Sequence, residues 1–252
     1  MHAPHRPPDQ TRGQLAFDDA AGPNLRQYER EILHLDALLA DFVTKLEAQM
    51  ADPAELLLVV TADHGEEFLE HGATAHVQLF DEVMHIPLFL RWPGRIPEGL
   101  RVDAPVSLVD IPPTVLELAG LSPEAGEGLS LVPLMGGTAL GRSMVFGQTA
   151  FPGLDLAQTG HFIARSRAAK CSVRRPADAG ASDPDPVCFD LAADPGEQDP
   201  LPVGARPEFA DLAREAIAYR ARALADPGPS GVTTSRPDPL REEKLRQLGY
   251  IE

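Results

Sequence analysis

The chain has 252 residues, of which 43% are hydrophobic and 24% are charged, and its formal net charge is −16 at pH 7. These values are ordinary for a globular protein with one large domain, and the negative charge argues against binding to nucleic acid or to an anionic membrane. The sequence has no apolar run of about 20 residues, the length that a membrane helix requires, and its start lacks the apolar segment of a signal peptide. We therefore expect no membrane segment and leave the localisation unknown.

Hydrophobic periodicity predicts an alternation of helices and strands in the first half of the chain. Apolar residues recur at steps of three and four from Leu25 to Leu46, which is typical of a helix with one apolar face. Asp110 can cap a second helix, and Gly120 suits the position just past its end. The expected elements are a loop over 1–23, a helix over 24–50, strands over 56–61, 86–91 and 102–108, and a helix over 110–120. This order is typical of an α/β sandwich.

After about residue 136 the pattern changes to short strands separated by turns, which predicts a small antiparallel subdomain. The expected elements are strands over 143–147, 161–165, 168–174 and 187–191, a helix over 207–224, a Pro-rich linker over 226–239 and a terminal helix over 240–248. Cys171 and Cys188 flank a probable hairpin and could form one bridge. Because unpaired cysteines are often buried, we expect two separate thiols instead.

The loop between the first two predicted strands carries the residues that point to chemistry. Asp63 and His64 follow a buried strand directly, and ligands bind at the carboxyl ends of strands in open α/β sheets. A carboxylate and an imidazole that converge on one ion suit Zn²⁺, Mn²⁺ or a mixed Ca²⁺ site. Further acidic and imidazole side chains follow, namely Glu66, Glu67, Glu70, His71 and His76. We interpret the loop as a metal and anion site. Its three glutamates could be ligands too, but we expect them on a solvated face, because four carboxylates on one ion would over-neutralise an anion site.

Several motifs, in one order along the chain, resemble those of the sulfatase family of the alkaline phosphatase superfamily. The loop itself and its flanks, TADHGEEFLEHG and LFDEVMHIPLFLRWPG, resemble the family's metal loop. The segments HAPHRPP, VDAPVSLVDIPPTVLELAGL, CFDLAADPGEQDPL and LREEKLRQLGYI are similar to the family's substrate loop, strand–helix unit, C-terminal hairpin and chain ending. The resemblance therefore extends over nearly the whole chain.

The resemblance implies a fold and a division into parts. The fold would be α/β, a partial alkaline-phosphatase-like mixed sheet sandwiched by helices, with a small C-terminal antiparallel β subdomain and a helix. Residues 1–135 would form the back part of the catalytic domain, with the metal and substrate loops. Residues 136–225 would form the C-terminal subdomain, and residues 226–252 the linker and terminal helix.

The resemblance also implies roles for particular residues. Asp63 and His64 would bind the metal, with Ca²⁺ expected first and Mn²⁺ or Zn²⁺ as alternatives. His76 and His5 would be catalytic residues that also contact the substrate from opposite sides, and His71 would be a further substrate-binding group. In this arrangement the metal polarises the sulfuryl oxygens, while histidines stabilise negative charge and protonate the leaving oxygen.

The sequence departs from the family pattern at the nucleophile. Sulfatases use a formylglycine made from a Cys or Ser in a Cys/Ser-x-Pro-x-Arg motif, and this chain contains no such motif. The segment 171–175 has the Cys-to-Arg spacing but Val173 in place of the proline, and it lies late in the chain, so we interpret it as unrelated. A truncated reading frame, one half of a split gene or a degenerate pseudoenzyme would each account for this departure.

We therefore expect a sulfatase-like, metal-dependent hydrolase of sulfate esters that is truncated and inactive as an isolated chain. Its substrate would be a sulfated small molecule or glycan, and an upstream half could be encoded separately. Two alternatives remain: a phosphodiester or phosphonate monoester hydrolase of the same superfamily, and a non-catalytic binding remnant.

Overall fold

The computed structural model describes residues 23–76, 78–122, 126–149, 161–174 and 185–225. The chain divides into two units, one formed by residues 1–56 with 228–252 and the other by residues 57–227. The predictions for 1–22 and for the terminal helix over 240–248 lie outside the described residues.

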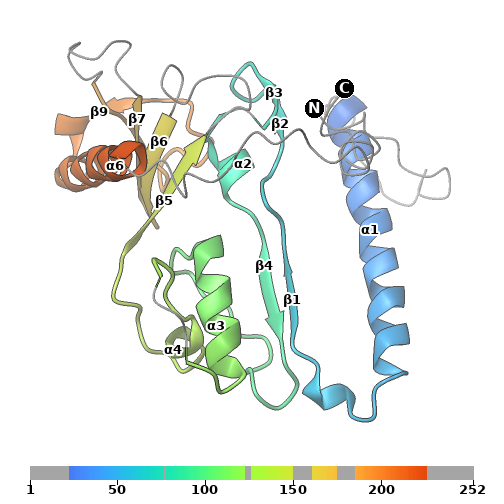
Figure 1. Ribbon diagram of the computed structural model, residues 1–252. Coiled ribbons are helices and arrows are strands. Elements are labelled where there is room, and N and C mark those ends of the chain that lie inside the picture. The colour runs from blue at the N-terminus through green and yellow to red at the C-terminus, as the bar shows by residue number, and fades with distance from the viewer. Residues whose placement is uncertain (1–22, 77, 123–125, 150–160, 175–184, 226–252) are drawn as a thin grey trace, which may run out of the picture. The chain divides into compact units, whose positions relative to one another are not determined.

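Helices occur in both units and the described strands lie in the second, which together confirm the predicted α/β class (Figure 1). The first unit contains α1 (Pro23–Glu47) and the 3-10 turn η2 (Pro53–Glu55). The second unit begins with β1 (Leu58–Thr61), β2 (Glu67–Phe68), β3 (Thr74–Ala75), α2 (Asp81–Met84), β4 (Leu88–Arg91), η3 (Leu108–Asp110), α3 (Ile111–Leu118) and α4 (Val132–Met135). It continues with β5 (Met144–Thr149), β6 (His161–Ser166), β7 (Ala169–Arg174), β8 (Val187–Asp190), β9 (Leu201–Pro202), η4 (Val203–Ala205) and α6 (Pro207–Ala225).

The helix predicted from the first apolar periodicity is α1, which ends three residues before the expected boundary. Several residues of its apolar stripe, among them Leu35 and Phe42, are exposed. Of the helices in the described ranges, none has the length and apolar character needed to cross a bilayer.

Strands β1 and β4 pair with each other in antiparallel register, with Leu58 opposite Arg91 and Thr61 opposite Leu88 (Figure 1). The loop of interest, residues 62–87, therefore leaves the carboxyl end of β1 and returns to the adjacent end of β4. The strand expected over 102–108 is absent from this fully described segment. The side chain of Asp110 accepts a hydrogen bond from the backbone nitrogen of Ser107 (2.8 Å), so this N–H is used in a helix cap rather than in a sheet.

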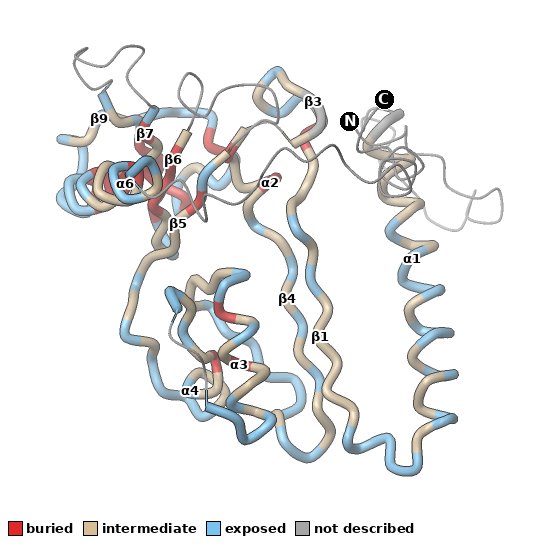
Figure 2. The backbone as a smooth tube through the Cα atoms, in the orientation of Figure 1, coloured by how far each residue is buried: buried red, intermediate tan, exposed pale blue. Residues whose placement is uncertain are grey.

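The C-terminal subdomain is a five-stranded antiparallel sheet, in the order β5-β6-β7-β8-β9, and α6 packs on β6 and β7. Figure 2 shows the buried residues concentrated where this helix meets these strands. Alternate residues of a strand share one face, so Phe162 of β6 and Cys171 and Val173 of β7 point toward the helix, which contributes Phe209 and Ala216. The predicted antiparallel strands and the following helix are therefore present, and this helix–sheet contact is the main core.

The two cysteines form a disulfide, so the expectation of separate thiols was wrong. Cys171 and Cys188 lie directly opposite each other in the β7–β8 register, and both are fully buried. Sequence spacing could not reveal this pairing because it depends on the register of the hairpin. Cys171 therefore has no free thiol, which agrees with interpreting segment 171–175 as unrelated to a nucleophile motif.

Candidate functional site

The loop that follows β1 is held against α2 by backbone hydrogen bonds. The backbone nitrogen of Gly65 donates to the carbonyl of Val83 (2.8 Å), and that of Glu66 donates to the carbonyl of Glu82 (3.1 Å). A Cβ atom at position 65 would lie 2.0 Å from the Glu82 carbonyl oxygen, so only glycine allows this close approach. The residues of α2 therefore form the support on which His64 and Glu66 are placed.

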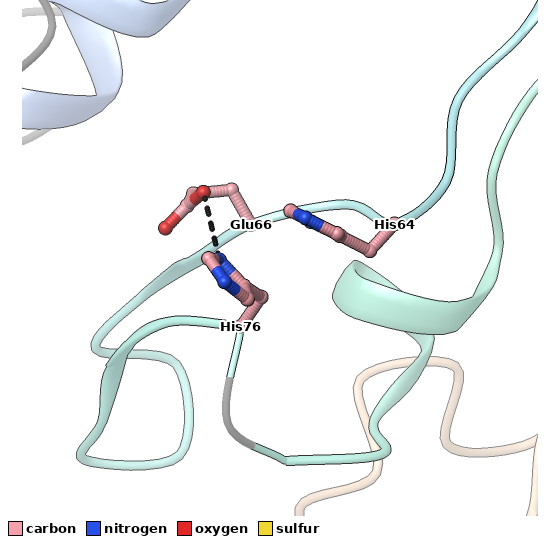
Figure 3. A group of neighbouring side chains, drawn as sticks. All are labelled: His64, Glu66 and His76. Atoms are coloured by element: carbon pink, nitrogen blue, oxygen red, sulfur yellow. Dashed lines mark ion pairs between the residues drawn. The ribbon is translucent and has the colours of Figure 1, made fainter. Parts of the chain in front are cut away.

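His64, Glu66 and His76 come together beside this support, and Figure 3 shows their side chains directed toward one another. One ligand atom from each residue lies within 4.8 Å of the other two. The imidazoles of His64 and His76 stack with their centroids 4.0 Å apart, and Nδ1 of His76 lies 3.6 Å from a carboxylate oxygen of Glu66. All three residues are half-buried. Two imidazole nitrogens and a carboxylate at this spacing can converge on one cation.

Asp63 lies at the edge of this group. Its side chain is 79% exposed, and its carboxylate is 3.7 Å from Nε2 of His64. Its other oxygen accepts a hydrogen bond from the His64 backbone nitrogen (3.0 Å), which fixes the turn after β1. The predicted metal ligands Asp63 and His64 are thus near each other, while the histidine alone joins the three-residue group.

His71 lies in a different environment from His76. Its ring stacks on Phe80, with the two centroids 3.4 Å apart, and its Nε2 lies 3.4 Å from a carboxylate oxygen of Glu82. Burial raises the pKa of Glu82 above its ordinary value, although the Glu82 backbone and the charge of His71 act in the opposite direction. His71 therefore packs against the segment that supports the loop, and the structure does not bring it into the three-residue group. His5 lies outside the described residues.

The expectation of a solvated glutamate face was wrong for two of its three members. Glu67 is 1% exposed and Glu66 belongs to the half-buried group, whereas Glu70 is exposed. The backbone hydrogen bonds from residues 65 and 66 to α2 turn this segment inward, which the sequence did not reveal. Glu66 is the member of the candidate site that sequence reasoning missed.

Residues 1–121 match the family model for Sulfatase. This part of the chain is therefore similar to the sulfatase family. Human arylsulfatase K is 37% identical over 100 residues, which correspond to 39% of this chain and 18% of that protein. The arylsulfatase K of Danio rerio is 42% identical over 80 residues, or 31% of this chain and 15% of that protein. The chain therefore spans less than a fifth of the length of these curated relatives.

Solved structures of similar fold extend over more of the chain. The structure of BT4656 in complex with its substrate D-glucosamine-2-N,6-O-disulfate has a TM-score of 0.57 at 22% identity and covers 93% of this chain and 44% of that one. The phosphonate monoester hydrolase SpPMH from Silicibacter pomeroyi has a TM-score of 0.61 at 26% identity and covers 80% of this chain and 41% of that one. These similarities confirm the predicted partial alkaline-phosphatase-like fold.

The sulfatase family is generally metal-dependent, and the residues of this site fit a divalent cation. Zn²⁺ accepts imidazole nitrogen and carboxylate oxygen together, and Mn²⁺ accepts carboxylate, whereas Ca²⁺ prefers oxygen ligands alone. The described group offers two nitrogens and one carboxylate, and the adjacent Asp63 adds a further carboxylate. In the arrangement that the structure shows, these donor atoms suit a transition-metal ion.

The part of the loop over 62–87 that leads to β4 is attached to the C-terminal sheet by an ion pair. Asp81, in the first turn of α2, receives hydrogen bonds from Nε (3.1 Å) and a terminal nitrogen (2.7 Å) of Arg165 on β6. Burial by itself would raise the pKa of Asp81, but the hydrogen bonds and charge of Arg165 and the charge of Lys170 outweigh it and hold this pKa below its ordinary value.

This shift predicts an acid-dependent loss of stability. A carboxyl whose pKa is lower in the folded state stabilises the protein above its unfolded pKa of about 4, and this contribution disappears as the pH falls further. The free energy of unfolding, measured in urea between pH 7 and pH 3, should fall on acidification, and it should fall less steeply in Asp81→Asn. Asp103→Asn, which changes an exposed carboxylate, should keep the wild-type slope; an unchanged slope in Asp81→Asn would contradict this assignment.

Proposed function

We propose that this chain carries the metal- and anion-binding side of a sulfatase-like hydrolase of sulfate esters. The observation that supports this is the convergence of His64, Glu66 and His76 in the loop of the family-matched segment. In this proposal Asp63 and His64 bind the metal, and His76 and His5 contact the substrate and move protons. His71 acts on the substrate side through its contact with Phe80.

The bound metal would polarise the sulfuryl oxygens and so make the sulfur more electrophilic. The chain's own residues would do the rest. An N–H of His76 can donate to a non-bridging oxygen or to the leaving oxygen, and a carboxylate oxygen of Glu66 lies 3.6 Å from Nδ1 of this ring. The nucleophile would have to come from outside this sequence, because its 252 residues contain no Cys/Ser-x-Pro-x-Arg motif. We therefore propose that the isolated chain binds metal and anion without turning over a sulfate ester.

Calorimetric titration of the full chain with Ca²⁺, Mn²⁺ and Zn²⁺, after removal of metal with a chelator, tests this proposal. We predicted Ca²⁺ first from the family resemblance, while the two imidazoles favour Zn²⁺ and the carboxylates are compatible with Mn²⁺. His64→Ala should weaken binding of the preferred ion by tenfold or more, in line with the loss of a proposed metal ligand. His85→Ala is the matched control, because His85 is an exposed histidine of the same loop and lies outside the three-residue group.

The absence of binding by all three ions, or equal effects of His64→Ala and His85→Ala, would contradict the metal site. An assay of the purified chain with an aryl sulfate tests the second part of the proposal. Turnover that Asp63→Ala abolishes would show that the chain has a nucleophile that we have not identified.

The substrate class is part of the proposal. The fold is shared with a protein solved with a disulfated glucosamine, which agrees with a sulfated glycan or small molecule as substrate. A phosphonate monoester is the second candidate, because the hydrolase from Silicibacter pomeroyi is similar over 80% of this chain. Competition of sulfate against methylphosphonate for the metal-loaded chain distinguishes the two, since the preferred anion should bind more tightly.

A further inference from the structure

Four charged side chains meet beneath the loop, where the C-terminal sheet contacts the segment around α2. Lys170 of β7 and Glu197, in the turn after β8, are 1% and 2% exposed. Asp81 and Arg165 complete the group, which thus holds two positive and two negative charges. Burying a lysine and a glutamate costs free energy unless each is paired with an opposite charge, so such a group indicates a specific role in the fold or at the site.

The ammonium of Lys170 has three oxygen partners. It donates to the carbonyl of Leu79 (2.9 Å), lies 3.2 Å from a carboxylate oxygen of Asp81 and lies 2.5 Å from a carboxylate oxygen of Glu197. Two of these partners, Leu79 and Asp81, belong to the last part of the loop over 62–87, while Lys170 itself belongs to β7, a largely buried strand of the sheet. One side chain thus connects the loop to the rigid core.

Glu197 is held in an unusual backbone conformation. Its φ of 53° lies in the left-handed region, which is uncommon for a residue other than glycine, asparagine or aspartate. Such a conformation persists only where the surroundings fix it. Here the carboxylate is fixed from both sides, since one oxygen pairs with Lys170 and the other accepts a hydrogen bond from the backbone nitrogen of Asp81 (2.7 Å).

A short chain of contacts leads from Lys170 to the histidines. Its ammonium lies 5.7 Å from the ring centroid of Phe80, and this ring stacks on His71. The same segment, residues 79–84, accepts the hydrogen bonds from Gly65 and Glu66, and it lies three residues after His76. Residues 64–66 on one side of the candidate site and His76 on the other are therefore both attached to residues 79–84, the segment that Lys170 contacts.

We propose that Lys170 is a positioning residue for the candidate metal and substrate site: its buried ammonium fixes residues 79–84 and so sets the relative positions of His64, Glu66 and His76. This inference rests on the proposed function for the role of those three residues, although its structural part can be tested without metal. Lys170 touches neither metal nor substrate and acts through the loop.

The test compares variants that remove the ammonium with variants that keep it. Lys170→Met removes the charge at similar length but leaves Glu197 as a buried charge without its partner, which can prevent folding. The double variant Lys170→Met with Glu197→Gln avoids that cost, because a glutamine at position 197 is neutral and can still accept the hydrogen bond from Asp81. Glu197→Gln alone keeps Lys170 on Leu79 and Asp81.

Two quantities are measured on each full chain. The first is the set of imidazole resonances of His71 and His76 in ¹⁵N-edited NMR spectra of the metal-free protein. The second is the affinity for Mn²⁺ or Zn²⁺. In the double variant we expect both histidines to shift or broaden and the affinity to fall by about 10- to 100-fold, the usual effect of losing a group that orients ligands. The amide resonances of Phe162 and Val173 should stay in place, which shows that the sheet remains folded.

Two variants serve as controls. Glu197→Gln alone should leave the histidine resonances close to those of the wild type. Arg214→Ala removes an exposed ion pair to Asp211 on α6 and should leave both quantities unchanged. A purely structural role for Lys170 would move the unfolding transition without moving the histidine resonances.

Wild-type histidine resonances in the folded double variant would overturn the positioning role, whatever the metal affinity of that variant. If instead the wild-type chain binds no metal while the histidines shift as expected, the proposed function fails and the positioning role stands. The two results are therefore distinguishable.

Discussion

Replacing Asp110 by alanine is expected to lower the free energy of unfolding by about 3–5 kcal/mol, the usual cost of breaking a buried ion pair on one side. The Asp110 side chain is fully buried and joins three segments of the chain. It accepts hydrogen bonds from the backbone nitrogens of Ser107 and Leu129 (2.8 Å each), and it pairs with both terminal nitrogens of Arg142. Alanine would leave these donors and a largely buried guanidinium without their acceptor.

Urea unfolding followed by the fluorescence of Trp92 measures this effect. Trp92 is the single tryptophan of the chain, and it lines one groove together with Leu131 and Leu134, so it reports on the segment that Asp110 fixes. Asp103→Ala is the matched control. Its pair with Arg167 is exposed on both sides, at 70% and 73%, and its loss should cost less than about 1 kcal/mol. Similar costs for the two variants would show that burial of the Asp110 pair does not matter.

The sequence predicted those elements whose residues obey a local rule. The apolar stripe of α1 and the glycine stop after α3 each depend on neighbours within a few residues, whereas Asp110 precedes α3 without capping it through its side chain. Gly120 has the positive φ of 74° that its place after a helix predicts. The elements therefore followed from periodicity and from cap residues.

The features that sequence reasoning missed depend on contacts between distant segments. The Cys171–Cys188 bridge follows from the register of a hairpin, and the antiparallel pairing of β1 with β4 follows from how a 26-residue loop closes. Local patterns carry no information on either. The family resemblance compensated for part of this, because it predicted the overall fold that the solved structures share.

The candidate site was predicted in part for the same reason. Asp63, His64 and His76 could be proposed because they lie close together in the sequence, in motifs whose residue types suggest metal and anion binding. Glu66 was expected on a solvated face, and no local pattern singled out Lys170. Its partner Asp81 lies 89 residues away along the chain, and only the fold brings the two side chains to 3.2 Å.

Replacing Gly65 by alanine is expected to destabilise the protein by about 3 kcal/mol and to weaken metal binding at the same time. A methyl group there would lie 2.0 Å from the carbonyl oxygen of Glu82 and 3.2 Å from Cα of Val83. Both neighbours are backbone atoms, so no side-chain rotation can relieve the contact, and overpacking of this kind costs about 1–3 kcal/mol. The alternative is that the segment moves away from α2, and it carries His64 and Glu66 with it.

Urea unfolding and calorimetric titration with Mn²⁺ or Zn²⁺ separate these outcomes. Gly141→Ala is the matched control, because a Cβ atom at that position meets no atom within 4 Å and should change stability by less than about 1 kcal/mol. If Gly65→Ala binds metal like the wild type, His64 and Glu66 do not need the close contact with α2. If metal binding and stability both fall in Gly65→Ala but not in Gly141→Ala, the hydrogen bonds from residues 65 and 66 to α2 keep His64 and Glu66 in place beside His76.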